Sequence, residues 1–396
     1  MAETRGIYRL LPAHMQKLPA PPADAVAHST RLQELIGREC TAAGGWLSFA
    51  RYMELALHAP GLGYYSAGSI KFGAAGDFVT APEMGRVFGR TLARQAAQIL
   101  QAGIPDIVEL GAGSGRLARD LLAELATLGS LPQRYRILET SADLQQRQRA
   151  LLQHDVPHLA GRVDWLDSLP STLTALVLGN EVLDAMPVHI VEVRTDGIAE
   201  RGVTLTEDGF QWQARPATGA LLASAQALDL PPGYVTEINL AAPSFIATLA
   251  STLERGVALF IDYGFPAREY YHAQRSSGTL MCHYRQHAHD DPLCLAGLQD
   301  ITAHVDFSAL AGAAARTGFD LLGYANQAQF LINCGITDVL AATSADDAAA
   351  YLPQAAQAQK LMSPAEMGEL FKVIALGRNF AVPLAGFARG DKSRQL

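Results

Sequence analysis

The stretch Val108-Glu-Leu-Gly-Ala-Gly-Ser-Gly115 decides the fold, because it stands where an apolar strand meets a helix. Residues 104–110 form a short apolar run, and residues 117–128 have the apolar spacing of a helix. Glycines at such a junction let the backbone turn tightly and approach a ligand, and the first turn of the helix offers free N–H groups. The stretch therefore predicts a ligand-binding turn after the first strand of a sheet.

The segments that follow alternate between strand and helix. The strand-like runs are 135–139, 163–166, 175–179, 256–263, 321–330 and 371–376, and a helix is predicted over 305–317. Such alternation is typical of a parallel, doubly wound sheet. Residues 188–215 instead alternate in the manner of antiparallel hairpins. We therefore expect an α/β fold with a mostly parallel, Rossmann-like sheet of seven strands, an N-terminal helical and loop cap, and inserted antiparallel strands.

The glycine spacing and the acid that follows it favour a nucleoside ligand. The pattern is GxGxG, with Arg116 where the dinucleotide-binding fingerprint GxGxxG has its third glycine. A ligand without a phosphate, such as S-adenosylmethionine, needs glycine for clearance rather than for holding an anion. Glu139, at the end of the second strand, is placed to bind both ribose hydroxyls. Two alternatives stay open: an ordinary strand–helix turn, and a nicotinamide-dependent oxidoreductase built on the same loop.

Polar residues on the third and after the fourth strand extend the predicted site. Asp164 and Trp165 could flank an adenine, although a half-buried core position explains Trp165 equally well. Asn180, Glu181 and Asp184 follow the apolar fourth strand. Ligands of open α/β sheets bind beyond the carboxyl ends of the strands, so these three side chains are expected to face the site. Asp184 could instead cap a helix that follows it.

Composition and charge exclude several classes of protein. The 396 residues carry a formal net charge of −8 without a block of like charges, which argues against nucleic-acid binding. No apolar stretch is near the roughly 20 residues needed to span a bilayer, and no signal or transit peptide is evident, so we expect a cytoplasmic protein. Residues 282–294 crowd cysteine, histidine and aspartate together, but their spacing matches no common zinc motif. No metal site is therefore predicted.

Seven motifs in a fixed order carry a resemblance to a known family. They are GLGYYS (61–66), GDFVTAPEMGRVFG (76–89), VELGAGSGRLARDLL (108–122), GNEVLDAMPV (179–188), FIDYG (260–264), DITAHVDFSAL (300–310) and MGELFKVIAL (367–376). With these motifs the chain resembles the class I S-adenosylmethionine-dependent methyltransferases of the MidA type, over residues 35–380. The resemblance implies a Rossmann-like methyltransferase core with an added domain, and S-adenosylmethionine as cofactor. For the mitochondrial member it implies methylation of an arginine in a subunit of respiratory complex I.

The residue patterns and the resemblance together give a predicted site. The expected cofactor-binding residues are Thr80, Pro82, Glu83, Glu109, Gly111, Ala112, Gly113, Gly115, Glu139, Thr140, Asp164, Trp165 and Asn180. The segment 77–83 resembles the part of the family that folds over the cofactor.

The methyl acceptor sets the remaining predictions. A guanidinium is always protonated in water, so carboxylates must hold it. Glu181 is the first candidate for this clamp, and Asn180 and Asp184 complete the predicted catalytic set. Glu237, Asp262 and Tyr263 are the predicted substrate-binding residues. A solvated edge-strand position would explain Glu237, and the capping of a turn would explain Asp262, equally well.

The expected organisation follows from these segments. The predicted parts are a mobile N-terminal arm (1–30), a helical cap with a cofactor-covering loop (31–100), a methyltransferase core (101–264) with an antiparallel insert near 188–235, a substrate-side insert (265–304), the end of the core (305–380) and a C-terminal tail (381–396). A protein substrate is the expected partner, without nucleic acid or membrane insertion, and homodimer formation stays open. A cofactor-binding assembly protein with little turnover is the main alternative function.

Overall fold

The computed structural model describes residues 18–66 and 80–396, which form two compact units. The core unit comprises residues 80–184, 242–267 and 305–396. The antiparallel unit comprises residues 18–66, 185–241 and 268–304. The chain therefore leaves the core unit after Asp184 and again after Ala267, and returns each time to complete the same unit.

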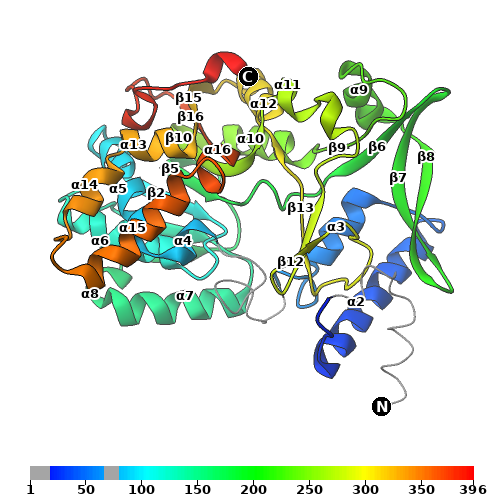
Figure 1. Cartoon of the computed structure of the whole chain (residues 1–396), viewed down its shortest axis with the longest axis horizontal. Coiled ribbons are helices and arrows are strands. Elements are labelled where there is room, and N and C mark those ends of the chain that lie inside the picture. Colours follow the sequence, from blue (N-terminus) through cyan, green and yellow to red (C-terminus); the bar gives the residue numbers. More distant parts are fainter. Residues whose placement is uncertain (1–17, 67–79) are drawn as a thin grey trace. The chain divides into compact units, whose positions relative to one another are not determined.

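The core unit is built on one mixed sheet (Figure 1). From edge to edge its strands are β15 (Asp320–Asn326), β16 (Phe371–Arg378), β10 (Leu253–Phe265), β5 (Leu173–Asn180), β2 (Asp106–Leu110), β3 (Tyr135–Leu138) and β4 (Val163–Leu166). Neighbours from β10 to β4 run parallel, whereas β16 runs antiparallel to both β10 and β15. A short β14 (Val305–Asp306) pairs in parallel with the end of β10. The expected α/β fold with a mostly parallel seven-stranded sheet is confirmed.

Helices cover both faces of this sheet. The helices of the core unit include α4 (Ala81–Met84), α5 (Arg86–Gln101), α6 (Arg116–Thr127), α7 (Ala142–Asp155), α8 (Pro157–Ala160), α10 (Ala241–Thr252), α12 (Phe307–Thr317), α13 (Gln327–Asn333), α14 (Ile336–Ala341), α15 (Ala348–Met362) and α16 (Met367–Leu370). No helix among the described residues combines the length and apolar character needed to cross a bilayer.

Strand β10 shows how the two faces divide. Its residues Val257, Leu259 and Ile261 belong to the apolar cluster that contains α5 and α6. The ring of Phe260 instead contacts Phe245 of α10, with 6.1 Å between the ring centroids. Because successive side chains of a strand point to opposite faces, α5 and α6 lie on one side of the sheet and α10 on the other. Burial on both faces also explains why this strand is apolar throughout rather than alternating.

The antiparallel unit contains two smaller sheets. One is formed by β1 (Leu47–Ser48), β6 (His189–Arg194), β7 (Gly197–Thr206), β8 (Gly209–Pro216) and β9 (Val235–Ile238). The other is formed by β11 (Met281–Tyr284), β12 (His287–His289) and β13 (Asp300–Thr302). The helices of the unit include α2 (Ala23–Ala42), α3 (Phe49–His58) and α9 (Gly219–Ala227). The strands expected within 188–215 are present, and they pair antiparallel as predicted.

Three elements differ from the sequence prediction. Helix α2 begins at Ala23 directly after Pro22, so the predicted arm 1–30 already contains the first turns of a helix, while residues 1–17 lie outside the described residues. The predicted strand over 321–330 ends at Asn326, whose side chain accepts a hydrogen bond from the Gln329 N–H and caps α13. The helix predicted over 305–317 begins at Phe307, because the two residues before it form β14.

Candidate active site

The glycine loop after β2 has a backbone that only glycine adopts without strain. Gly111, Gly113 and Gly115 have φ angles of +60°, +53° and +83°. A Cβ at Gly111 would also lie 3.0 Å from a methyl group of Val182. Gly115 is the N-cap of α6, so the first N–H groups of that helix are oriented toward the loop. Ala112, between the first two glycines, is nearly buried.

Glu139 lies directly after β3, at the same carboxyl edge of the sheet as the glycine loop. Its side chain is 8% exposed. One carboxylate oxygen, Oε1, accepts a hydrogen bond from the Ser141 N–H at 2.9 Å, and the other, Oε2, accepts one from the Gln148 amide at 3.4 Å. Thr140, the next residue, is exposed. The carboxylate is thus held in a fixed orientation beside the loop.

Glu83 of α4 is joined to the glycine loop. Its Oε1 accepts a hydrogen bond from the Ser114 hydroxyl, and its Oε2 lies 3.3 Å from the guanidinium of Arg116. Arg116 also donates to the Glu83 carbonyl at 3.1 Å. Of its predicted neighbours in the site, Pro82 is buried and Thr80 is half-buried, whereas positions 77–79 lie outside the described residues. Glu83 therefore contacts the loop that was predicted to bind the cofactor.

Asp164 and Trp165 have protein partners of their own. Asp164 is exposed in β4 and lies 3.8 Å from the guanidinium of Arg134. The indole N–H of Trp165 donates to Gln148 at 2.8 Å, and the guanidinium of Arg149 stacks over the ring at 4.3 Å from its centroid. These contacts favour structural roles for both side chains, and their placement at an adenine stays a prediction.

Glu109 is buried within the sheet. It is 2% exposed, and its carboxylate accepts a hydrogen bond of 2.7 Å from the hydroxyl of Tyr135 on the neighbouring strand β3. Burial raises the pKa of Glu109 to about 7, and the charge of Glu139 contributes to the increase. Glu109 is therefore enclosed within the sheet, and its side chain is not exposed to a ligand at the surface of the site.

Glu181 has the strained backbone of the site. It follows β5 immediately and has a φ of +53°, a conformation that costs a residue other than glycine roughly 1–2 kcal/mol. Its N–H donates to the Ile261 carbonyl of β10 at 2.8 Å, and Oε1 of its carboxylate accepts a hydrogen bond of 2.9 Å from the amide of Asn180. The Asn180 Oδ1 is buried and has no hydrogen-bond partner among the described residues. Strain of this kind is commonly kept at functional positions.

Asp262 of β10 holds the turn that contains Glu181. Its side chain is fully buried; Oδ2 accepts from the N–H groups of Leu183 and Asp184, at 2.9 and 3.3 Å, and Oδ1 accepts from Tyr263 at 2.9 Å. Burial raises the pKa of Asp262 well above its usual range, and the neighbouring carboxylates of Asp184 and Glu181 add to the increase. The turn-capping role considered from the sequence is therefore observed for Asp262. No helix begins at Asp184 in the described chain, so the helix-cap explanation of that residue is wrong.

Comparison with known proteins identifies the family. The family described as "Putative S-adenosyl-L-methionine-dependent methyltransferase" matches residues 91–325, more than half of the chain. The chain belongs to this methyltransferase family. The predicted enzyme class and cofactor are thereby confirmed, and the family decides against the nicotinamide-dependent oxidoreductase that the glycine loop had left open.

Solved structures and curated relatives agree with the family. A crystal structure from Burkholderia thailandensis, bound to S-adenosyl-homocysteine, is 52% identical, with a TM-score of 0.93 over 96% of this chain and 100% of that chain. The "Protein arginine methyltransferase NDUFAF7, mitochondrial" of Danio rerio is 29% identical over 87% of this chain and 89% of its own length. The protein of the same name from Mus musculus is 30% identical over 84% of this chain and 81% of its length.

The carboxyl edge of the sheet fits an adenosyl cofactor. The positive φ angles of the glycine loop leave no side chain between the backbone and a ligand. Glu139 presents a carboxylate of the kind that binds ribose hydroxyls, and the buried Asn180 Oδ1 is an acceptor without a protein donor among the described residues. Gly111, Gly113, Gly115, Glu139 and Asn180 would therefore hold the cofactor of this family.

Glu237 lies in the antiparallel unit on β9, an edge strand of its sheet, but its side chain is buried rather than solvated. It is 3% exposed, and its carboxylate accepts hydrogen bonds from both the N–H and the hydroxyl of Thr279, from the Leu280 N–H and from the Tyr270 hydroxyl, at 3.0 to 3.2 Å. Burial raises its pKa and these donors lower it. The solvated-edge explanation is wrong, and the contacts favour a structural role over the predicted substrate contact.

The cysteine and histidine cluster of residues 282–294 is partly buried. Burial raises the pKa of Cys294, and that of Cys282 well above its usual range, so neither thiol is activated. Gln299 donates to the carbonyls of Asp291, Pro292 and Cys294. Within the described parts of the chain, no three His, Cys, Asp or Glu side chains are placed to share a metal ion.

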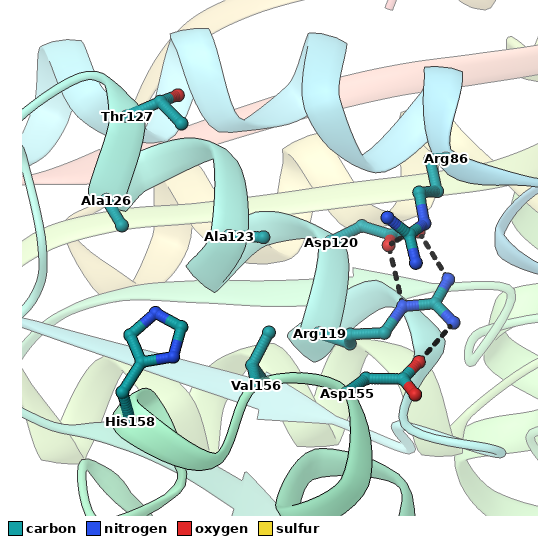
Figure 2. Close-up of a pocket in the computed structure, with 9 residues that line it drawn as sticks. All are labelled: Arg86, Arg119, Asp120, Ala123, Ala126, Thr127, Asp155, Val156 and His158. Atoms are coloured by element: carbon teal, nitrogen blue, oxygen red, sulfur yellow. Dashed lines mark hydrogen bonds and ion pairs between the residues drawn. The ribbon is translucent and has the colours of Figure 1, made fainter.

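An open pocket of about 440 Å³ lies elsewhere in the core unit (Figure 2). Its lining residues are Arg86, Arg119, Asp120, Ala123, Ala126, Thr127, Asp155, Val156 and His158. Arg119 pairs with both Asp120, at 2.7 Å, and Asp155, at 3.0 Å, while Arg86 lies 3.8 Å from Asp120. These charges neutralise one another, and the pocket shares no residue with the predicted cofactor site.

Two polar residues near the cofactor edge were not predicted from the sequence. Gln148 of α7 is fully buried and contacts the glycine loop, Glu139 and Trp165. Asp167 directly follows β4, the position that the strand-end rule favours, and it accepts from Gln145 at 3.5 Å. The predicted strand 163–166 already ends at Leu166, so the rule could have found Asp167. A glutamine inside a helical pattern carries no comparable signal.

Proposed function

We propose that this methyltransferase transfers a methyl group to a guanidinium nitrogen of an arginine side chain in a protein substrate. The observation that carries the proposal is the group of acids at the carboxyl ends of β5 and β10. Glu181 is held there in a strained conformation, and burial raises the pKa of Asp262, with the charges of Asp184 and Glu181 adding to the increase. A guanidinium carries a permanent charge and binds carboxylates with paired hydrogen bonds, so it is the acceptor that this group of acids fits.

Glu181, Asn180 and Asp262 have different roles in the proposed reaction. Glu181 holds the guanidinium, and the Asn180 amide fixes the orientation of its carboxylate through the 2.9 Å hydrogen bond. Asp262 holds the turn through its hydrogen bonds to the N–H groups of residues 183 and 184. The bound cofactor supplies the methyl group on a sulfonium. The protein contributes alignment of the acceptor nitrogen with that methyl group and a carboxylate that takes the proton released from the nitrogen.

Curated relatives support the acceptor. Proteins named protein arginine methyltransferase NDUFAF7 match this chain at 29% and 30% identity over more than four fifths of its length. At this distance a shared reaction is a proposal for this chain. Subunits of respiratory complex I are the first substrates to test, because the resemblance of the motifs implies them.

The test is transfer of label from tritiated S-adenosylmethionine to proteins of the parent cell. A lysate from a strain that lacks the gene is incubated with the purified enzyme, and the labelled proteins are hydrolysed to amino acids. Label in methylarginine is the expected result. Label in another amino acid would contradict the guanidinium acceptor, and cofactor binding without protein labelling would favour the assembly-protein alternative.

A further inference from the structure

Gln148 of α7 joins three parts of the cofactor edge. Its amide nitrogen donates to the Gly113 carbonyl at 2.9 Å and lies 3.4 Å from the Glu139 carboxylate, while its carbonyl oxygen accepts from the indole N–H of Trp165 at 2.8 Å. The side chain is fully buried. One glutamine thus connects the glycine loop, the acid after β3 and strand β4.

The chemistry of its partners fixes the amide in one orientation. An indole N–H can only donate, and a backbone carbonyl and a carboxylate can only accept. The amide oxygen must therefore face Trp165, and the amide nitrogen must face Gly113 and Glu139. With both amide hydrogens and the oxygen engaged, rotation of the group would break every one of these hydrogen bonds, so the network has a single arrangement.

The same residue also packs against the loop. A Cβ added to Gly115 would lie 3.1 Å from the Cγ of Gln148, so the helix and the loop are in close contact. The guanidinium of Arg149 lies over the face of the Trp165 ring, 4.3 Å from its centroid, and so restricts the indole that donates to Gln148. The loop backbone and the Glu139 carboxylate therefore share one rigid support.

We propose that Gln148 is a positioning residue for the cofactor: it sets the distance and orientation between the glycine loop and the Glu139 carboxylate without contacting the reacting atoms. The Ser141 N–H and the Gln148 amide donate to different oxygens of the Glu139 carboxylate, so the two hydrogen bonds together fix its orientation. This inference rests on the cofactor-binding part of the proposed function and is independent of the methyl acceptor.

The first test compares two buried glutamines. Gln148→Met keeps the size of the side chain and removes its hydrogen bonds. The matched control is Gln327→Met, because Gln327 of α13 is also fully buried and donates to the Leu361 carbonyl at 3.0 Å, away from the loop. Calorimetric titration with S-adenosylhomocysteine is expected to show a roughly ten- to hundredfold weaker Kd for Gln148→Met. Gln327→Met is expected to lower the unfolding temperature and leave the Kd unchanged.

The second test uses a pH profile that simple packing would not produce. In Gln148→Glu, a protonated carboxyl can donate to the Gly113 carbonyl and accept from Trp165, as the amide does. An ionised carboxylate loses the donor and repels Glu139. The Kd for S-adenosylhomocysteine, relative to wild type at each pH, is therefore expected to rise with pH for Gln148→Glu and to stay flat for Gln327→Glu.

Glu139→Ala separates the failure of this proposal from the failure of the site. If Glu139→Ala weakens binding of S-adenosylhomocysteine while Gln148→Met binds like wild type, the positioning role is overturned. If both variants bind like wild type, the predicted cofactor site and the positioning role of Gln148 are both wrong. A weaker Kd that appears equally in Gln327→Met would reduce the role of Gln148 to general stability, which also overturns the proposal. None of these outcomes depends on an arginine acceptor.

Discussion

Glu237 and Asp262 are both buried acids at the ends of strands, and their surroundings differ. Glu237, in the antiparallel unit, is enclosed by N–H and hydroxyl donors from Thr279, Leu280 and Tyr270; burial raises its pKa, and the hydrogen bonds from Thr279 and Leu280 lower it. Asp262, in the core unit, has Asp184 and Glu181 as neighbours, and their charges oppose its ionisation. A buried acid surrounded by local donors stabilises a loop. A group of acids that repel one another is better explained by a cation that binds there.

The largest expected effect comes from removing the acid nearest to the proposed acceptor. Glu181→Gln should lower kcat for methyl transfer by about 100- to 1,000-fold, because the amide cannot hold the guanidinium or take its proton. The Kd for S-adenosylhomocysteine should change by less than a few fold. The matched control is Glu254→Gln, since Glu254 is exposed near the opposite end of β10 and should have no effect. Full turnover by Glu181→Gln would contradict the proposal that the acids around Asp262 bind the cationic acceptor.

A second prediction concerns Glu109, a buried acid with a single strong donor. Its folded-state pKa of about 7 lies above the usual 4.5, so below pH 4.5 the group is neutral in both states. Between pH 4.5 and 7 the unfolded chain loses this proton first, and the free energy of unfolding falls as the pH rises. The side chain in Glu109→Gln does not ionise, so the free energy of unfolding does not fall with pH for this reason. The variant should be more stable than wild type by roughly 3 kcal/mol at pH 8, with almost no difference at pH 4.

Urea unfolding of Glu109→Gln and wild type across this pH range measures the difference. Tyr135→Phe sharpens the result, because it removes the hydrogen bond that lowers the pKa of Glu109 and should extend the loss of stability to higher pH. A constant difference between Glu109→Gln and wild type at all pH values would show that Glu109 does not titrate in this range.

The smallest expected effect tests the structural role of Glu237. Glu237→Gln should lower the free energy of unfolding by about 2 kcal/mol, since the amide turns N–H groups toward the donors of Thr279 and Leu280. Methyl transfer per folded molecule should stay at the wild-type rate. Glu200→Gln is the control in the same unit, because the hydrogen bond of Glu200 within the described residues joins it to His189, at 2.6 Å, and its loss should cost less. A stable Glu237→Gln protein without transfer would assign Glu237 to the substrate after all.

The sequence predicted those features whose cause is local. The glycine loop was recognisable because positive φ angles require glycine, and the mostly parallel sheet followed from the alternation of apolar strands and helices. The run 321–330 was misjudged because an apolar stretch does not distinguish a buried strand from a buried helix. Phe330 and Leu331 are buried in α13 just as Tyr324 and Ala325 are in β15.

The features that the sequence did not predict depend on distant contacts. Gln148 is one of several glutamines in α7, and only the packing of that helix against the loop and β4 distinguishes it. Likewise, the positive φ of Glu181 occurs together with a hydrogen bond from its N–H to Ile261 of β10, about eighty residues later, which the local sequence does not indicate. The donors around Glu237 come from residues 270–280, so its burial could not be inferred from the strand that contains it.

The interleaving of the two units in the chain has a consequence for how the protein can be divided. Both departures from the core unit, after Asp184 and after Ala267, follow neighbouring strands β5 and β10, and the chain returns at Ala242 and Val305. Shortening the protein from either end therefore isolates neither unit, since each cut leaves an incomplete sheet. Excision of the antiparallel unit requires removal of residues 18–66 and linkers that join 184 to 242 and 267 to 305, and such a minimal protein would report whether the core sheet folds by itself.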